Sequence, residues 1–167
     1  MKTLTEYLSD YASYHRDNRN IATHFVGIPL IVVAVAVLLS RPVMDLQVVI
    51  VSPAVVVSLL AGIFYLRLDV RLGLVMCAVL AASVGIGRLL AAESTVFWLT
   101  SGLGMFVVGW IIQFIGHYYE GKKPAFVDDL IGLAIGPLFV AAEVAFKLGL
   151  RDELNQAIEQ RAGPVRN

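Results

Sequence analysis

Residues 21–40 of the chain read IATHFVGIPLIVVAVAVLLS, and this stretch decides the fold. His24 is its one ionisable side chain, and Arg41, Pro42 and Asp45 follow it. A helix needs about 20 consecutive apolar residues to cross the hydrocarbon core of a bilayer. The stretch therefore predicts a membrane-spanning helix.

Three further apolar stretches have a similar length, residues 46–66, 72–92 and 94–119, and Pro53 is expected to kink the first of them. Across the chain 58% of residues are hydrophobic and 16% are charged, whereas an ordinary soluble domain has about a quarter charged. We therefore predict an all-α polytopic membrane helix bundle with four transmembrane helices, which has the lipid bilayer as its partner. The net charge is +0 and there is no basic run, which argues against nucleic-acid binding.

Two flanking segments differ from these spans. Residues 130–142 form a fifth apolar stretch of only 13 residues, and Gly136-Pro137 is expected to break it, which predicts a re-entrant or interfacial segment. Residues 4–14 carry apolar side chains at three- and four-residue spacing, which predicts an amphipathic helix in the membrane interface with its tyrosines at headgroup level. We assign residues 1–150 to one membrane-embedded domain and residues 151–167 to a polar C-terminal tail.

Lysines and arginines indicate the orientation, because cytoplasmic loops carry an excess of them. With four spans and a cytoplasmic N-terminus, Arg41 and Arg88 lie outside and seven basic residues lie inside: Lys2, Arg16, Arg19, Arg67, Arg71, Lys122 and Lys123. If the fifth segment turns back, the basic residues of the tail join the inside set. We therefore expect cytoplasmic termini. We expect the membrane to be a bacterial inner membrane, or the endoplasmic reticulum membrane if the organism is a eukaryote.

The three histidines all fall on the side predicted to be cytoplasmic. His24 lies at the start of the first span, His117 lies near the end of the fourth, and His15 precedes the first. On one continuous helix, His15 and His24 would lie about 180° apart. Residues 17–20 read DNRN and predict a bend between them, since Asn and Asp favour turns and helix caps. With that bend, the three imidazoles can converge.

Gln113, His117 and Glu120 form one stripe of the fourth span, and Gly116 beside them leaves room for close approach. Converging histidines suit a divalent transition metal. Glu120 is then either a fourth ligand or an acceptor that orients a histidine. Ordinary roles remain open for these residues: an interfacial histidine often only forms hydrogen bonds, Gln113 can join two helices, and Asn20 can cap one.

Two motifs carry a family resemblance. Residues 14–29 contain the pattern Y-H-x4-N-x3-H-x4-P, and residues 113–124 contain Q-F-x-G-H-x-x-E-x3-P. In this order, and separated by three apolar stretches, they resemble the 2-hydroxy-fatty-acid dioxygenases, a family of small integral membrane proteins. The resemblance covers the chain from about Leu4 to Leu150.

The resemblance implies Fe(II)-dependent α-oxidation, in which O2 shortens a 2-hydroxy fatty acid by one carbon. It implies that His15, His24 and His117 hold the iron. We expect Glu120 to take part in catalysis, and the polar residues around it to bind substrate or support the ligands: Asn20, Gln113, Tyr14 and Lys122. The alternatives are a non-enzymatic transporter or lipid-binding scaffold, or another metal-dependent membrane lipid enzyme. Chain-length preference and oligomeric state stay open.

Overall fold

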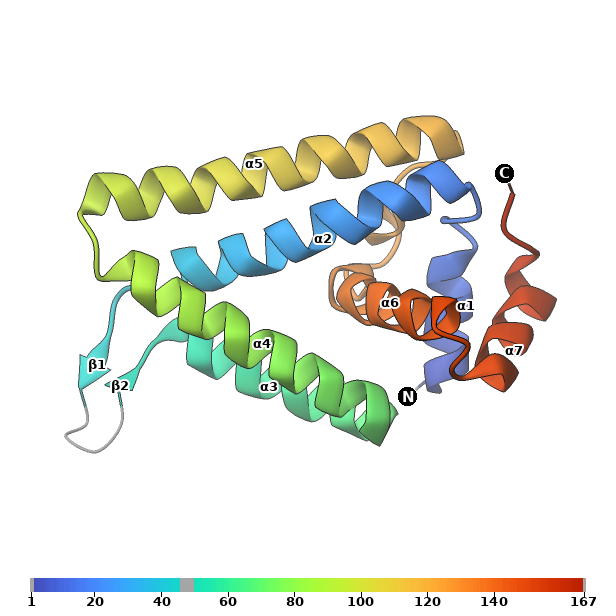
Figure 1. Cartoon of the computed structure of the whole chain (residues 1–167), viewed down its shortest axis with the longest axis horizontal. Coiled ribbons are helices and arrows are strands. Elements are labelled where there is room, and N and C mark those ends of the chain that lie inside the picture. The colour runs from blue at the N-terminus through green and yellow to red at the C-terminus, as the bar shows by residue number, and fades with distance from the viewer. Residues whose placement is uncertain (1, 46–49, 167) are drawn as a thin grey trace. The chain divides into compact units, whose positions relative to one another are not determined.

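Helices make up most of the chain in the computed structural model, which describes residues 2–45 and 50–166 (Figure 1). The helices are α1 (Leu4–Ala12), α2 (Asn18–Leu38), α3 (Pro53–Leu68), α4 (Val70–Ala91), α5 (Thr95–Glu120), α6 (Gly132–Lys147) and α7 (Asp152–Ala162). A 3-10 turn, η1 (Ala125–Val127), and an antiparallel pair of two-residue strands, β1 (Met44–Asp45) and β2 (Ile50–Val51), complete the described elements. The predicted helical class is confirmed.

Among the described residues, three helices are long and apolar enough to cross a membrane: α2, α4 and α5. They have 21, 22 and 26 residues, against the roughly 20 that a span needs. Large apolar side chains on them, such as Leu74, Leu89 and Val96, are exposed, which suits contact with lipid. The helices α6 and α7 add a fourth candidate only if this pair, bent by 118°, counts as one span. The structure thus supports three spans, or four with the bent pair.

The second predicted span, residues 46–66, differs from the structure. Residues 46–49 lie outside the described part of the chain, and α3 begins only at Pro53 and has 16 residues. Pro53 lies in the first turn of this helix, where its missing N–H costs nothing and its fixed φ suits the helix start. The expected kink at Pro53 is therefore wrong, and α3 is shorter than the expected span.

The helix α6 runs without interruption through Gly136-Pro137, so the expected break there is wrong. Pro137 lies near the start of the helix, and proline inside membrane helices is tolerated where neighbouring groups adjust to it. Gly136 allows a close approach to α1, since a Cβ at this position would lie 2.9 Å from the Tyr11 hydroxyl oxygen. The chain turns instead after Lys147, where Gly149 adopts a φ of +70°.

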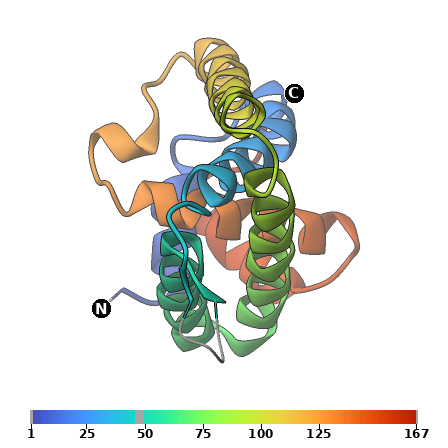
Figure 2. The ribbon, with the colours of Figure 1, turned by 90° about the vertical axis from the view of Figure 1, so that its left-hand side faces the viewer.

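The chain divides into two compact units, one of Met1–Ile28 with Ile111–Asn167 and one of Pro29–Trp110. In the second unit, α3 and α4 lie side by side as a helical hairpin (Figures 1 and 2). A Cβ on Gly73 of α4 would lie 2.7 Å from the Leu66 Cα, so the two backbones are in direct contact there. The absence of a side chain at Gly73 therefore sets the spacing of the hairpin.

In the first unit, α1 packs against α6 and α7. A capping box begins α1: the Thr3 hydroxyl accepts the Glu6 N–H at 3.3 Å, and the Glu6 carboxylate accepts the Thr3 N–H at 2.7 Å. Leu8 and Ala12 on this helix are fully buried. The apolar face that was predicted to lie in the membrane interface is therefore covered by protein.

We predict that Gly73→Ala destabilises the protein by about 1–3 kcal/mol, because the new methyl group meets the α3 backbone, which cannot give way as a flexible side chain can. Thermal unfolding in detergent measures the effect. Gly85→Ala is the matched control on the same helix, since a Cβ there meets nothing within 4 Å. Equal unfolding temperatures for the two variants would contradict the tight contact.

Candidate metal centre

A short turn joins α1 to α2 and carries the first histidine. The helix α1 ends at Ala12 and α2 begins at Asn18, so His15 lies in the turn while His24 lies in the second turn of α2. This turn is the bend that the residues DNRN predicted, and it begins a few residues earlier than expected. Because the chain reverses here, the two histidines face each other.

The three histidines form one buried cluster in the first unit. His15, His24 and His117 each offer a ring nitrogen, and these nitrogens all lie within 4.8 Å of one another. The ring centroids are 4.4 Å apart for His15 and His24, 4.9 Å for His15 and His117, and 5.2 Å for His24 and His117. The exposed fractions are 0%, 1% and 7%. The predicted convergence is confirmed.

Backbone carbonyls fix the tautomers of two of these rings. The Nδ1 of His15 lies 2.6 Å from the Tyr11 carbonyl oxygen, and the Nδ1 of His24 lies 2.8 Å from the Asn20 carbonyl oxygen. A carbonyl only accepts, so each Nδ1 carries the proton and each Nε2 keeps a free lone pair. This is the arrangement in which a ligating histidine donates its other N–H to a supporting group.

The histidines fit a divalent transition metal. The Nε2 of His15 and the Nδ1 of His117 are buried and have no hydrogen-bond partner within the described part of the chain. Desolvation and the neighbouring imidazole of His24 hold the pKa of His15 well below its usual range, so this ring is neutral. Neutral imidazole is a good ligand for Zn, Cu, Fe and Ni. The cluster therefore offers nitrogen ligands in the correct protonation state.

Glu120 lies beside the turn. The group of candidate metal ligands found among the described residues consists of the three histidines and does not include Glu120. One carboxylate oxygen, Oε2, accepts the backbone N–H groups of Arg16 at 2.9 Å and Asp17 at 2.7 Å, and the Asn20 side-chain amide at 3.1 Å. The other, Oε1, accepts from the Arg166 guanidinium at 2.6 Å. Both oxygens are thus engaged in holding the turn that carries His15.

Glu120 can reach the turn because the start of α2 and the end of α5 approach each other closely. A Cβ on Gly116 would lie 2.1 Å from the Thr23 hydroxyl and 2.5 Å from Asn20 Oδ1, so a larger residue would separate the two helices. Asn20 uses its amide group to reach Glu120, while its Oδ1 is buried without a partner among the described residues. Gln113, one turn before His117 on α5, likewise has a buried Nε2 without a partner there. These two polar groups remain available to a ligand.

Tyr11 supports the cluster, a role that was not predicted from the sequence. Its ring stacks on His15, with centroids 4.1 Å apart and planes inclined by 7°. Phe139 of α6 packs on both rings, 5.1 Å from Tyr11 and 5.7 Å from His15. Tyr11 is buried, so the expectation that it lies at headgroup level is wrong. Its position four residues before His15 was the available signal, whereas nothing in the sequence marked Phe139.

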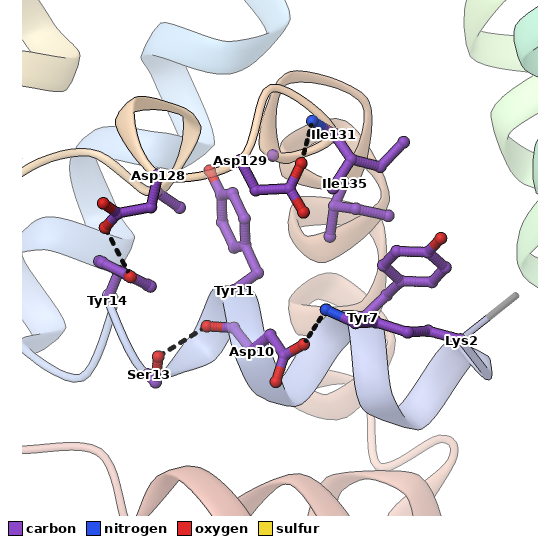
Figure 3. A pocket seen from close by; sticks show the side chains of 12 residues that line it. Lys2, Tyr7, Asp10, Tyr11, Ser13, Tyr14, Asp128, Asp129, Ile131 and Ile135 are labelled. Carbon is purple, nitrogen blue, oxygen red and sulfur yellow. Dashed lines mark hydrogen bonds and ion pairs between the residues drawn. The ribbon is translucent and has the colours of Figure 1, made fainter.

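Tyr11 also lines a pocket of about 280 Å³ between α1 and the start of α6 (Figure 3). Three carboxylates line it, Asp10, Asp128 and Asp129. Tyr14, from the first motif, lies beside Asp128 and donates to it at 2.7 Å. Tyr14 is therefore tied to the segment before α6.

Lys122, also singled out from the sequence, lies close to the same turn. Its ammonium group donates to the Ser13 carbonyl oxygen at 2.7 Å. Lys123, beside it, pairs with Asp128 at 2.5 Å. Lys122 therefore joins the end of α5 to the end of α1.

Comparison with known proteins identifies the family of the chain. The family model described as "2-hydroxy-palmitic acid dioxygenase Mpo1-like" matches residues 1–148. The chain is 31% identical over 158 residues to the 2-hydroxy-palmitic acid dioxygenase MPO1 of Saccharomyces cerevisiae, an alignment that covers 93% of this chain and 87% of the yeast protein. No solved structure matches. The chain belongs to the Mpo1-like family of 2-hydroxy-palmitic acid dioxygenases.

Proposed function

We propose that this protein is an Fe(II)-dependent dioxygenase that uses O2 to shorten 2-hydroxy fatty acids by one carbon. Family membership and the name of the yeast relative support a dioxygenase that acts on such acids. The observation that carries the proposal is the buried cluster of His15, His24 and His117, whose nitrogens lie within 4.8 Å of one another.

In this proposal the three histidines hold the metal. Bound Fe(II) would supply redox chemistry with O2 and coordination positions open to the substrate. The Tyr11 and Asn20 carbonyls hold the His15 and His24 rings in the orientation that turns Nε2 toward the cluster. Burial excludes bulk water, so the histidine ligands stay neutral.

Two amides next to the cluster are candidates for binding the substrate. The Gln113 Nε2 is a buried donor and the Asn20 Oδ1 is a buried acceptor, and neither has a partner among the described residues. A carboxylate needs donors and a 2-hydroxyl group can donate, so this pair matches the head of a 2-hydroxy acid. An unpaired buried polar group costs about 1–3 kcal/mol, which substrate binding would offset.

The cations close to the turn have partners already. Lys122 donates to the Ser13 carbonyl oxygen, and Lys123 pairs with Asp128. The Arg19 side chain bonds Asp17 at 2.8 Å and lowers the pKa of that carboxyl group to about 2. We infer that Lys122 and Tyr14 support the turn, as Glu120 does, and that recognition of the carboxylate falls to the metal and to Gln113.

We place the site at the cytoplasmic boundary of the membrane. His24 lies near the start of α2 and His117 in the last turn of α5, and both helices are candidate spans. With α3 crossing as well, the start of α2 and the end of α5 lie on one side of the membrane, and the excess of lysine and arginine on that side supports the cytoplasmic orientation. The acyl chain of the substrate would then lie in the hydrocarbon layer, with its head at the metal.

We expect His15→Ala, His24→Ala and His117→Ala each to abolish conversion of 2-hydroxypalmitate to the C15 product, because each removes one metal ligand. The assay contains the purified protein, Fe(II) and O2, and mass spectrometry quantifies the product. Tyr118→Phe is the matched control, since Tyr118 is 83% exposed on the same helix turn.

Metal analysis separates this function from its alternatives. After anaerobic loading, the wild type should hold about one iron per chain, and each histidine variant should hold far less. Product formation that persists in all three variants would end the proposal. Tight zinc binding with no product would favour a hydrolytic enzyme, since neutral imidazoles also suit zinc.

We expect Gln113→Leu to lower kcat/KM roughly 10–100-fold while iron content stays at the wild-type level, because the substrate loses a donor that is not a ligand. Steady-state kinetics at saturating Fe(II) measure this. Gln160→Leu, on the exposed side of α7, is the control. An unchanged kcat/KM would mean that Gln113 only joins helices.

A further inference from the structure

The segment after residue 148 lies beyond the match to the family model, yet it returns to the metal centre. Leu154 and Ile158 of α7 are buried, and α7 packs against α1. Gly163 ends the helix with a φ of +85°, a conformation that glycine adopts without strain, and redirects the chain. The last described residues thereby reach the turn between α1 and α2.

Backbone hydrogen bonds attach Arg166 to this turn. The Arg166 N–H donates to the Arg16 carbonyl at 2.6 Å, and the Asn18 N–H donates to the Arg166 carbonyl at 2.9 Å. These two bonds form a parallel bridge between Asp17 and Arg166. The Arg16 side chain adds a third tie, because its Nη1 donates to the Gly163 carbonyl at 2.9 Å.

The side chain of Arg166 bonds the buried carboxylate of Glu120. Its Nη2 lies 2.6 Å from Glu120 Oε1, and the Glu120 side chain is 0% exposed. A buried carboxylate is stable only when it is paired and hydrogen-bonded. Oε2 of the same carboxylate holds the N–H groups of Arg16 and Asp17. The position of the carboxylate, and with it the turn, therefore depends on both of its oxygens being satisfied.

We propose that Arg166 is a positioning residue of the metal centre: through Glu120 it fixes the turn that sets His15 against His24. The proposal rests on the proposed function in that it takes these histidines as metal ligands. Supporting residues that do not touch a metal commonly change its affinity about 10–100-fold when they are removed. The segment 152–166 then supports the site, although the match to the family model ends at residue 148.

The test uses the full chain in detergent and Co(II) as the probe. Arg166→Gln should bind Co(II) at least about tenfold more weakly and alter its visible absorption spectrum. In the metal-free protein, the Arg16 and Asp17 amides should exchange hydrogen faster. The Asn18 amide should keep its protection, because it bonds the Arg166 backbone. Arg166→Lys, which retains a cation, should restore most of the affinity.

Arg161→Gln is the matched control, since Arg161 is an exposed arginine of α7. Arg166→Met replaces Arg166→Gln if the latter does not fold. The proposal requires both faster amide exchange and weaker Co(II) binding in Arg166→Gln. If either property stays at the level of the control, the proposal is overturned. If the wild type binds no Co(II), the proposed metal chemistry fails, and exchange at Arg16 and Asp17 then decides whether Arg166 positions the turn.

Discussion

The carboxylate of Glu120, accepting the backbone N–H groups of Arg16 and Asp17, is the interaction on which the site depends. These donors precede α2, where the chain has no helical acceptor for them, and a carboxylate is the strongest partner available. Glu120 follows His117 by three residues and so lies one helical turn further along the same face of α5. One buried side chain thus ties the end of α5 to the turn that carries His15, and brings the three histidines into register.

The histidines themselves are held by the rest of the first unit. Tyr11 contributes twice to His15, through its carbonyl oxygen and through its stacked ring, and Phe139 packs against both rings. Buried imidazoles with unpaired nitrogens are costly, since each unsatisfied polar atom costs about 1–3 kcal/mol. A metal ion bound at these nitrogens, as proposed, would offset that cost. The cluster is therefore preorganised for a ligand at some expense in the stability of the fold.

Hydrophobic stretches and the histidine pattern predicted much of this from sequence. Long apolar runs specify α2, α4 and α5, because span length is set by the bilayer, and DNRN marked the reversal that joins His15 to His24. Hydropathy placed the start of α3 too early, because apolar residues before Pro53 are compatible with a strand as well as with a helix. It also missed the contact of Arg166 with Glu120, because residues 46 positions apart share no local pattern.

The proposed substrate has two different requirements, and a site at the membrane boundary would satisfy both more easily than a site in a soluble protein. A 2-hydroxy fatty acid has a long apolar chain that prefers hydrocarbon and a polar head that needs donors and a metal. The helices α2 and α5 are apolar enough to cross the membrane, and His24 and His117 lie at the ends of these same helices. With the site at the membrane boundary, as proposed, the acyl chain would stay in the bilayer while its first two carbons reach the histidines, and the whole lipid would not need to be extracted into water.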